Sequence, residues 1–235
     1  MLYRTRNISF GGGSVTPAVK FLLIVNAAVF IVQIFLDRYI VLLFGLVPRS
    51  VWQDFYLWQL FTYQFLHGGL FHLLFNMLAL WMFGCALERR WGSEFFLKYY
   101  FVSVIGGGIL NTLFMPDQIV PSIGASAGVY GILLAFGLIY PNQIIYLYFL
   151  VPLKMKHFVW IIGAIALYSS VTSGQSGIAH LAHLGGMLFG YLYLRGGNPW
   201  ERWKLYLDRR RLARLKKRFH VIPGGKDEDS GPTLH

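Results

Sequence analysis

Three clusters of polar side chains lie within long uncharged stretches of this sequence. They contain His72 with Asn76, then Ser126, and finally His183. A serine hydroxyl becomes a nucleophile when a nearby base takes its proton, and imidazole suits that task near neutral pH. We therefore expect Ser126 and His183 to form a catalytic dyad. Acyl transfer also needs donors directed at the developing oxyanion, which His72, Asn76 and the Ser126 backbone N–H can supply.

No acid is placed to complete a Ser-His-Asp triad. All ten Asp and Glu residues lie outside the uncharged stretch of residues 157–194 that holds His183. In a triad the acid orients the imidazole and stabilises its charged form. We therefore expect packing, and no carboxylate, to orient the His183 ring.

The composition indicates the solvent in which these residues lie. Hydrophobic residues make up 56% of the 235-residue chain and charged residues only 13%, whereas a soluble domain carries about 25% charged residues. Crossing the hydrocarbon takes about 20 apolar residues, and each crossing must be helical so that its backbone groups are paired. The sequence therefore predicts an all-α polytopic membrane protein, a bundle of six transmembrane helices. The predicted spans are roughly residues 17–36, 69–87, 95–115, 123–140, 157–172 and 178–194.

Basic residues predict the orientation of the chain. If the N-terminus is cytoplasmic, every Lys and Arg except Arg38 and Arg49 falls on the cytoplasmic side, in agreement with the positive-inside rule. We expect a cytoplasmic N-terminal segment (residues 1–16), a six-span membrane domain (17–195) and a basic cytoplasmic tail (196–235). The absence of a transit-like N-terminus and the compact six-span plan favour a bacterial plasma membrane.

The net charge of +11 follows from this topology and from contact with the lipid bilayer, so we expect no nucleic-acid partner. Within the tail, residues 200–219 mix basic residues with apolar ones, among them Trp200 and Trp203. That mixture suits a helix lying on an anionic leaflet. It equally suits a solvated tail whose charge only fixes the topology.

Small residues line the two predicted spans that would carry the dyad. His183, Gly186 and Gly190 share one helical face of the sixth span, and Ala127 and Gly131 begin a similar stripe on the fourth. Such stripes let two helices approach closely, so the nucleophile and its base could meet. The predicted topology also places all three polar clusters in the outer part of their spans. A small-residue stripe or a single polar side chain within a span can be explained by helix packing alone. The occurrence of all three polar clusters at one depth instead indicates a functional site.

These residues resemble the motifs of the rhomboid family of intramembrane serine proteases. The resemblance covers roughly residues 65–193, and it rests on four motifs that occur in order along the chain. They are His67-Gly-Gly-Leu-Phe-His72-Leu-Leu-Phe-Asn76, Glu88-Arg89-Arg90-Trp91-Gly92, Gly124-Ala125-Ser126, and Ala182-His183-Leu184-Gly185-Gly186 with Gly190.

The resemblance implies a role for each residue of the site. Ser126 would attack the scissile carbonyl to form an acyl-enzyme that water then hydrolyses, and His183 would act as general base and acid. His72, Asn76 and the Ser126 amide would line the oxyanion hole. Tyr130, one turn after the serine, would pack against the His183 ring.

The resemblance also implies the substrate class, a single-span membrane protein that enters sideways between helices and is cut near its outer end. No cofactor and no metal ion is implied. Glu88 and Arg90 would hold the turn after the second span. One departure is visible, because the family often has glycine directly after the serine, where this chain has Ala127 followed by Gly128. Alanine is small, so we expect activity to survive.

Two other functions fit parts of the pattern. A catalytically inactive rhomboid-like protein that binds or escorts membrane clients would be expected to lack the serine or the histidine, and both are present. A metal site or metal transporter could use the four histidines of the apolar region, but no carboxylate accompanies them there. Those histidines are His67, His72, His180 and His183.

Overall fold

The computed structural model describes residues 14–147, 150–172 and 180–196. The chain divides into two units, residues 1–195 and 196–235, and apart from Gly196 all of the described residues belong to the first. The predicted basic segment of residues 200–219 therefore lies outside the described residues.

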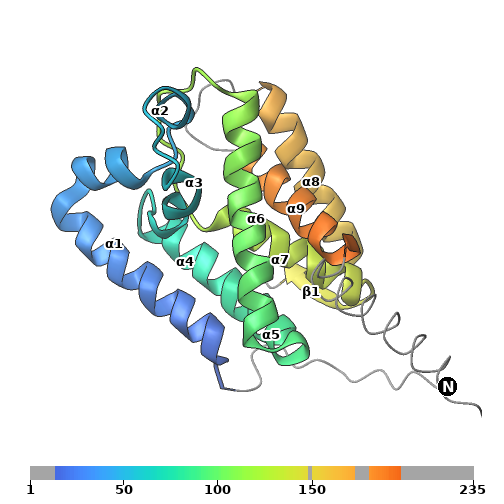
Figure 1. Ribbon diagram of the computed structural model, residues 1–235. Helices are drawn as coiled ribbons and strands as arrows, with labels where there is room; N and C mark the ends of the chain where they lie inside the picture. Colours follow the sequence, from blue (N-terminus) through green and yellow to red (C-terminus); the bar gives the residue numbers. More distant parts are fainter. Residues whose placement is uncertain (1–13, 148–149, 173–179, 197–235) are drawn as a thin grey trace, which may run out of the picture. The chain divides into compact units, whose positions relative to one another are not determined.

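The described part of the chain is predominantly helical (Figure 1). Its helices are α1 (Pro17–Phe44), α2 (Pro48–Gln53), α3 (Gln59–Thr62), α4 (Leu70–Ala79), α5 (Cys85–Trp91), α6 (Ser93–Phe114), α7 (Ser126–Ile139), α8 (Met155–Thr172) and α9 (His180–Gly196). A 3₁₀ turn, Tyr63–Phe65, follows α3, and a π-helical segment, Leu80–Gly84, joins α4 to α5.

Four helical segments are long and apolar enough to cross a membrane. They are Pro17–Leu36, Leu70–Trp91, Ser93–Phe114 and Met155–Thr172. Helix α7 has 14 residues and α9 has 17, so both are shorter than a full crossing within the described residues. The prediction of a helical polytopic membrane protein is confirmed, and the count of six spans stays a prediction. Helix α1 also continues to Phe44, beyond the predicted end of the first span at residue 36.

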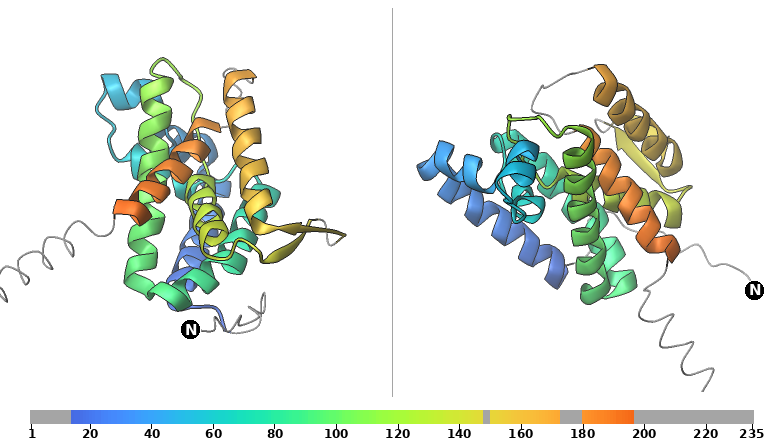
Figure 2. Two further views of the ribbon diagram at one scale, coloured as in Figure 1. Left: turned by 90° about the vertical axis from the view of Figure 1, so that its right-hand side faces the viewer. Right: turned by 45° about the horizontal axis from the view of Figure 1, so that its top comes forward.

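Helix α6 forms the centre of the packed bundle, where it contacts α1, α3, α5 and α7 (Figures 1 and 2). Three buried tyrosines attach it to its neighbours through hydroxyl groups that would otherwise be unpaired in an apolar interior. Tyr99 donates to the Gly131 carbonyl at 2.6 Å, and Tyr100 donates to Gln64 Oε1 at 2.7 Å. Tyr63 donates to the Val104 carbonyl of α6 at 2.8 Å. These bonds fix α7 and the segment before α4 against one central helix.

The buried carboxylate of Glu88 closes the end of the bundle where α1 begins. It accepts hydrogen bonds from the backbone N–H groups of Ala18 at 2.8 Å and Val19 at 2.9 Å. It also accepts the hydroxyl of Ser93 at 2.6 Å and that of Thr16. Since the first N–H groups of a helix have no partner within that helix, this one carboxylate caps α1 and ties it to the turn before α6.

A β-hairpin, which the sequence analysis did not predict, connects α7 to α8. Its strands are β1 (Ile144–Leu147) and β2 (Val151–Lys154), paired antiparallel with Ile144 opposite Lys154. Figure 2 shows the hairpin projecting from the helices beside it. Strand β2 runs directly into α8, and the Met155 N–H at the helix start donates to the Gln143 carbonyl at 2.8 Å. The hairpin therefore sets the position at which α8 begins.

Candidate active site

Ser126 is the first residue of α7. The chain reaches it through Gly124, whose φ of +125° lies in a region that side chains rarely adopt, and whose N–H donates to the Tyr63 carbonyl at 3.0 Å. The first N–H groups of an α-helix have no intrahelical partner and carry the positive end of the helix dipole. The hydroxyl of Ser126 is thus placed at a position where backbone donors are available for a developing negative charge.

His183 on α9 contacts this serine directly. Its Nε2 lies 2.7 Å from Ser126 Oγ, at hydrogen-bond distance. The contact depends on a close approach of the helix backbones, because a Cβ added at Gly186 would lie 2.1 Å from the Ala127 carbonyl oxygen. Gly131 is equally crowded, with the Ser103 hydroxyl 2.4 Å from its ideal Cβ position. Small residues at these positions allow α9 to bring the imidazole to the serine.

The ring of Tyr130 covers one face of the His183 imidazole. The two ring centroids are 4.3 Å apart, and the ring planes are within 10° of parallel. His180 meets the imidazole edge-on, with centroids 6.0 Å apart. Nδ1 of His183 is buried and has no hydrogen-bond partner among the described residues. Among the described residues, ring packing is therefore the contact that orients the His183 imidazole.

His72 on α4 lies beside the turn at Gly124 that precedes the serine. An ideal Cβ at Gly124 would stand 2.7 Å from both Cε1 and Nε2 of the His72 ring and 3.8 Å from Ser126 Oγ. The Nε2 edge of His72 therefore faces the backbone turn that leads into the nucleophile. Its other ring nitrogen, Nδ1, accepts the N–H of Gly68 at 3.2 Å.

Asn76 lies one helical turn after His72 and is buried. Its Nδ2 donates to the His72 carbonyl at 3.0 Å, a bond within α4 itself. An amide nitrogen carries two hydrogens, so this bond leaves the second one for another acceptor. Asn76 therefore retains one donor, and it also holds the backbone of His72.

His67 lies in the segment before α4 and contacts His72 instead of the dyad. The ring centroids of these two histidines are 5.1 Å apart in an edge-to-face arrangement. Neither ring nitrogen of His67 has a hydrogen-bond partner within the described residues. Burial, with a further contribution from the nearby His72, lowers the pKa of His67 to about 4. The side chain is therefore neutral at physiological pH.

One polar residue of this region was missed by the sequence analysis. Gln33 on α1 is buried and hydrogen-bonded to both backbone groups of His67. The signal that could have found it is its position, one of two amide side chains (with Asn26) in an apolar span, where polar groups are costly.

The four histidines do not assemble into a recognisable metal site. Among the described residues, no group of three or more His, Cys, Asp or Glu side chains is arranged to hold a metal ion. The ring contacts are instead pairwise, between His67 and His72 and between His180 and His183.

Comparison with known proteins places this arrangement in a family. Residues 54–197 match the rhomboid domain. RHOMBOID-like protein 12, mitochondrial, of Arabidopsis thaliana is 30% identical over 182 residues, which cover 70% of this chain and 54% of that protein. RHOMBOID-like protein 4 of the same plant is 34% identical over 142 residues, 57% of this chain and 32% of that protein.

A bacterial relative is also similar. Rhomboid protease GluP of Bacillus subtilis (strain 168) is 42% identical over 89 residues, which cover 38% of this chain and 16% of that protein. The chain thus spans between 16% and 54% of the length of these three relatives. The domain match is longer than half of the chain and includes the contacts described above from His67 to His183; this integral membrane protein therefore belongs to the rhomboid family.

Proposed function

We propose that this protein is an intramembrane serine endopeptidase that cuts single-span membrane proteins with a Ser126–His183 dyad. The observation that carries the proposal is the 2.7 Å separation between His183 Nε2 and Ser126 Oγ. Membership of the rhomboid family supports it, as does the similarity to a relative named as a rhomboid protease. No cofactor enters the proposed reaction.

The proposed reaction begins with proton transfer from Ser126 Oγ to His183 Nε2. Oγ attacks the scissile carbonyl carbon, and the electron pair of the C=O bond moves to oxygen. The Ser126 N–H and a His72 N–H would donate to this oxyanion, with the free N–H of Asn76 as a further donor. When the intermediate collapses, the C–N bond breaks and the leaving amine takes the proton from His183 Nε2. Water, deprotonated by the same imidazole, then hydrolyses the acyl-enzyme and restores Ser126.

The imidazolium formed in this cycle would be held by packing. The parallel ring of Tyr130 presents its electron-rich face to the charged imidazole, which is a favourable cation–π arrangement. In a dyad without a carboxylate, no acid fixes the tautomer of the imidazole. Other contacts must therefore keep the serine and the histidine aligned. The contact between α7 and α9 at Gly186 supports that alignment.

The proposed orientation has both termini in the cytoplasm, and the proposed location is a bacterial plasma membrane. The distribution of Lys and Arg supports the orientation. The relatives include plant proteins named as mitochondrial, so the location is tested separately, by fractionation of cells expressing the tagged protein. Recovery in another membrane would contradict the proposed location while leaving the orientation and the reaction intact.

The activity is tested with purified protein in liposomes and a model single-span substrate. We expect cleavage by the parent and none above background by Ser126→Ala or His183→Ala. Matched controls are Ser170→Ala and His157→Ala on α8, where the Ser170 hydroxyl donates to the Leu167 carbonyl of its own helix. Equal cleavage by the parent and Ser126→Ala would refute the dyad.

A fluorophosphonate probe distinguishes the protease from an inactive relative. An activated serine reacts covalently with such a probe, so we expect labelling of the parent at Ser126 and none of His183→Ala. A folded parent that is not labelled and does not cut substrate would favour the alternative, a rhomboid-like protein that binds membrane clients.

A further inference from the structure

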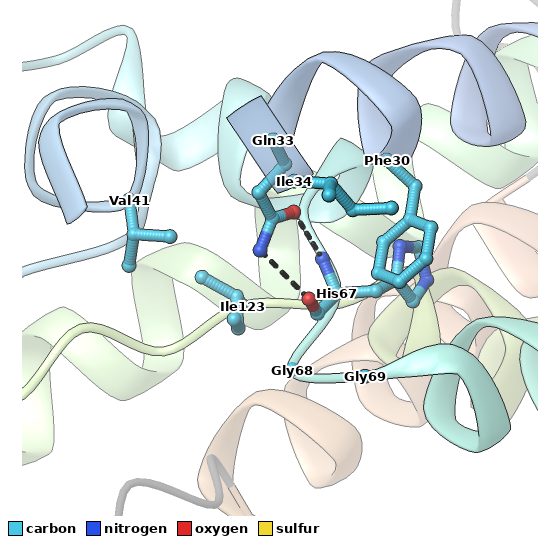
Figure 3. A pocket seen from close by; sticks show the side chains of 8 residues that line it. All are labelled: Phe30, Gln33, Ile34, Val41, His67, Gly68, Gly69 and Ile123. Carbon is cyan, nitrogen blue, oxygen red and sulfur yellow. Dashed lines mark hydrogen bonds between the residues drawn. The ribbon is translucent and has the colours of Figure 1, made fainter. Parts of the chain in front are cut away.

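Gln33 on α1 holds the backbone of the segment that leads into α4. Its Nε2 donates to the His67 carbonyl at 2.8 Å, and its Oε1 accepts the His67 N–H at 3.0 Å. Figure 3 shows both bonds side by side. A backbone N–H can only donate and a carbonyl can only accept, so the orientation of the Gln33 amide is unambiguous. One side chain thus satisfies both backbone groups of a residue 34 positions away.

The next residue along the chain carries this constraint to His72. The N–H of Gly68 donates to Nδ1 of His72 at 3.2 Å. In a neutral imidazole one ring nitrogen is a donor and the other an acceptor. If Nδ1 accepts the Gly68 N–H, the proton must lie on Nε2. Nε2 is on the ring edge that faces Gly124, beside the nucleophile.

The two glycines of this segment are loosely surrounded. An ideal Cβ at Gly69 would meet nothing within 4 Å, and one at Gly68 would make only ordinary contacts, the nearest being His72 Nδ1 at 3.7 Å. A cavity of about 280 Å³ adjoins the segment, lined by Phe30, Ile34 and Ile123 together with Gln33 (Figure 3). The ring nitrogens of His67 make no hydrogen bonds within the described residues. The Gln33 pair therefore restrains the residue before Gly68, and the Leu73 N–H, which donates to the Gly69 carbonyl at 3.1 Å, restrains the residue after it.

We propose that Gln33 is a positioning residue for the oxyanion hole, because it holds the His67–Gly68 backbone so that the Gly68 N–H keeps His72 protonated on Nε2. The catalytic consequence rests on the proposed function, whereas the tautomer of His72 does not. Without the Gln33 amide the segment can move into the adjoining cavity, and His72 can exchange to the tautomer protonated on Nδ1. That tautomer presents a lone pair to the oxyanion instead of a donor, and its population reduces the rate.

The first test is a spectroscopic measurement on the parent. The protein is labelled with ¹⁵N-histidine in lipid nanodiscs, and the His72 signals are assigned by their loss in His72→Asn. The nitrogen shifts report directly which ring nitrogen carries the proton. We expect a protonated Nε2 and an unprotonated Nδ1. A proton on Nδ1 in the parent overturns the proposal without any Gln33 variant and whatever the activity of the protein.

The second test removes the Gln33 bonds. Gln33→Leu removes both, and Gln33→Met removes both while keeping an unbranched side chain of similar length. The matched control is Asn26→Leu, a buried amide on the same helix whose Nδ2 bonds only the Leu22 carbonyl of its own helix, at 2.8 Å. We expect both Gln33 variants to populate the Nδ1-protonated tautomer of His72 and the control to retain the parent spectrum.

The effect of the Gln33 variants on catalysis is measured as kcat and KM for substrate cleavage in liposomes. Losing an oxyanion donor outright costs about 10²–10³-fold in kcat, so a partial loss of the donor tautomer predicts about a tenfold fall in kcat with KM changed less than twofold. An unchanged His72 tautomer in folded Gln33→Leu overturns the proposal, even when cleavage by the parent upholds the protease function. If the Gln33 variants shift the His72 tautomer but the parent cleaves no substrate, the positioning role is upheld and the protease function is refuted.

Discussion

The imidazole of His183 lies flat against the phenol ring of Tyr130, with ring centroids 4.3 Å apart. In the proposed dyad this contact would take the place that a hydrogen-bonded carboxylate has in a Ser-His-Asp triad. It restrains the tilt of the imidazole, but it cannot choose between the two ring nitrogens. The direction of Nε2 toward Ser126 must therefore come from where α9 begins and how closely it packs on α7.

The stacking contact predicts a graded response to substitution of Tyr130. An aromatic pair contributes about 0.5–1.5 kcal/mol beyond its buried area, so Tyr130→Leu should lower kcat roughly two- to tenfold. Tyr130→Phe keeps the ring and should cut substrate at nearly the parent rate. Initial cleavage rates in liposomes measure the difference. A Phe variant as slow as the Leu variant would show that the hydroxyl matters, and the stacking argument would fail.

The contact between α7 and α9 predicts that Gly186→Ala abolishes activity. The added methyl group would stand 2.1 Å from the Ala127 carbonyl oxygen, which is backbone and cannot rotate away. The helices must separate, and His183 moves away from Ser126 with them. We expect at least a hundredfold loss of cleavage and a destabilisation of about 1–3 kcal/mol from overpacking.

Gly163→Ala on α8 is the matched control for this substitution. Its added methyl group would meet only the flexible end of Met187, at 3.5 Å. We expect parent activity and unchanged or slightly higher stability, since alanine favours a helix over glycine by about 1 kcal/mol. If both glycine variants cut substrate at the parent rate, the close approach at Gly186 is not what aligns the dyad.

The contact between Ser126 and His183 was predictable from the sequence because two independent signals coincide there, whereas their catalytic role stays a prediction. Ser126 and His183 lie in uncharged stretches, and the small residues around them repeat at helical spacing, which indicates a close helix contact. Tyr130 followed only from the family resemblance. The role of Gln33 could not be predicted, because helical periodicity shows which face a side chain occupies but not which distant backbone it bonds.

The predicted bounds of the first span, residues 17–36, match the candidate membrane span within α1, and the structure shows two further features that have physical reasons. Helix α1 extends to Phe44 because a span must end where the hydrocarbon ends, whereas the helix itself can continue into the interface. The hairpin of β1 and β2 escaped detection because residues 144–154 lack the Asn-Gly or Asp-Gly turn that marks a tight hairpin.

Glu88 is predicted to be a main determinant of stability. Its carboxylate accepts the N–H groups of Ala18 and Val19 and the Ser93 hydroxyl while itself buried. Net contributions of hydrogen bonds to a charged group are about 1.5–3 kcal/mol each, so Glu88→Ala should lower the free energy of unfolding by roughly 3 kcal/mol or more. Thermal unfolding in detergent micelles measures this change.

Glu94→Ala is the control for this prediction. Glu94 is exposed on α6 and pairs with Lys98 at 2.5 Å, four residues along the same helix. Such exposed pairs contribute little to stability because water and salt screen them, so the unfolding temperature should barely change. Equal effects of the two substitutions would show that the hydrogen bonds of Glu88 do not stabilise α1.

The buried neutral imidazole of His67 predicts acid sensitivity. Its pKa is lowered to about 4 in the folded protein, mainly by burial, whereas an unfolded histidine titrates near pH 6.5. Between these values the unfolded state binds the additional proton, so the free energy of unfolding falls as the pH is lowered from 6.5 toward 4 and is independent of this group above 6.5. The full effect is on the order of 3 kcal/mol, from about 1.4 kcal/mol per unit of pKa.

The measurement compares the parent with His67→Phe, which keeps an aromatic ring in place but cannot take up a proton. Unfolding temperatures in micelles are recorded at pH 7.5, 6 and 5. Carboxylates such as Glu88 titrate in both proteins, so the informative quantity is the difference between the two pH profiles. We expect the two curves to run parallel above pH 6.5, and the parent to lose stability faster than the variant below it. Parallel curves down to pH 5 would mean that His67 can be protonated in place, in contact with water or with a partner that the folded bundle provides.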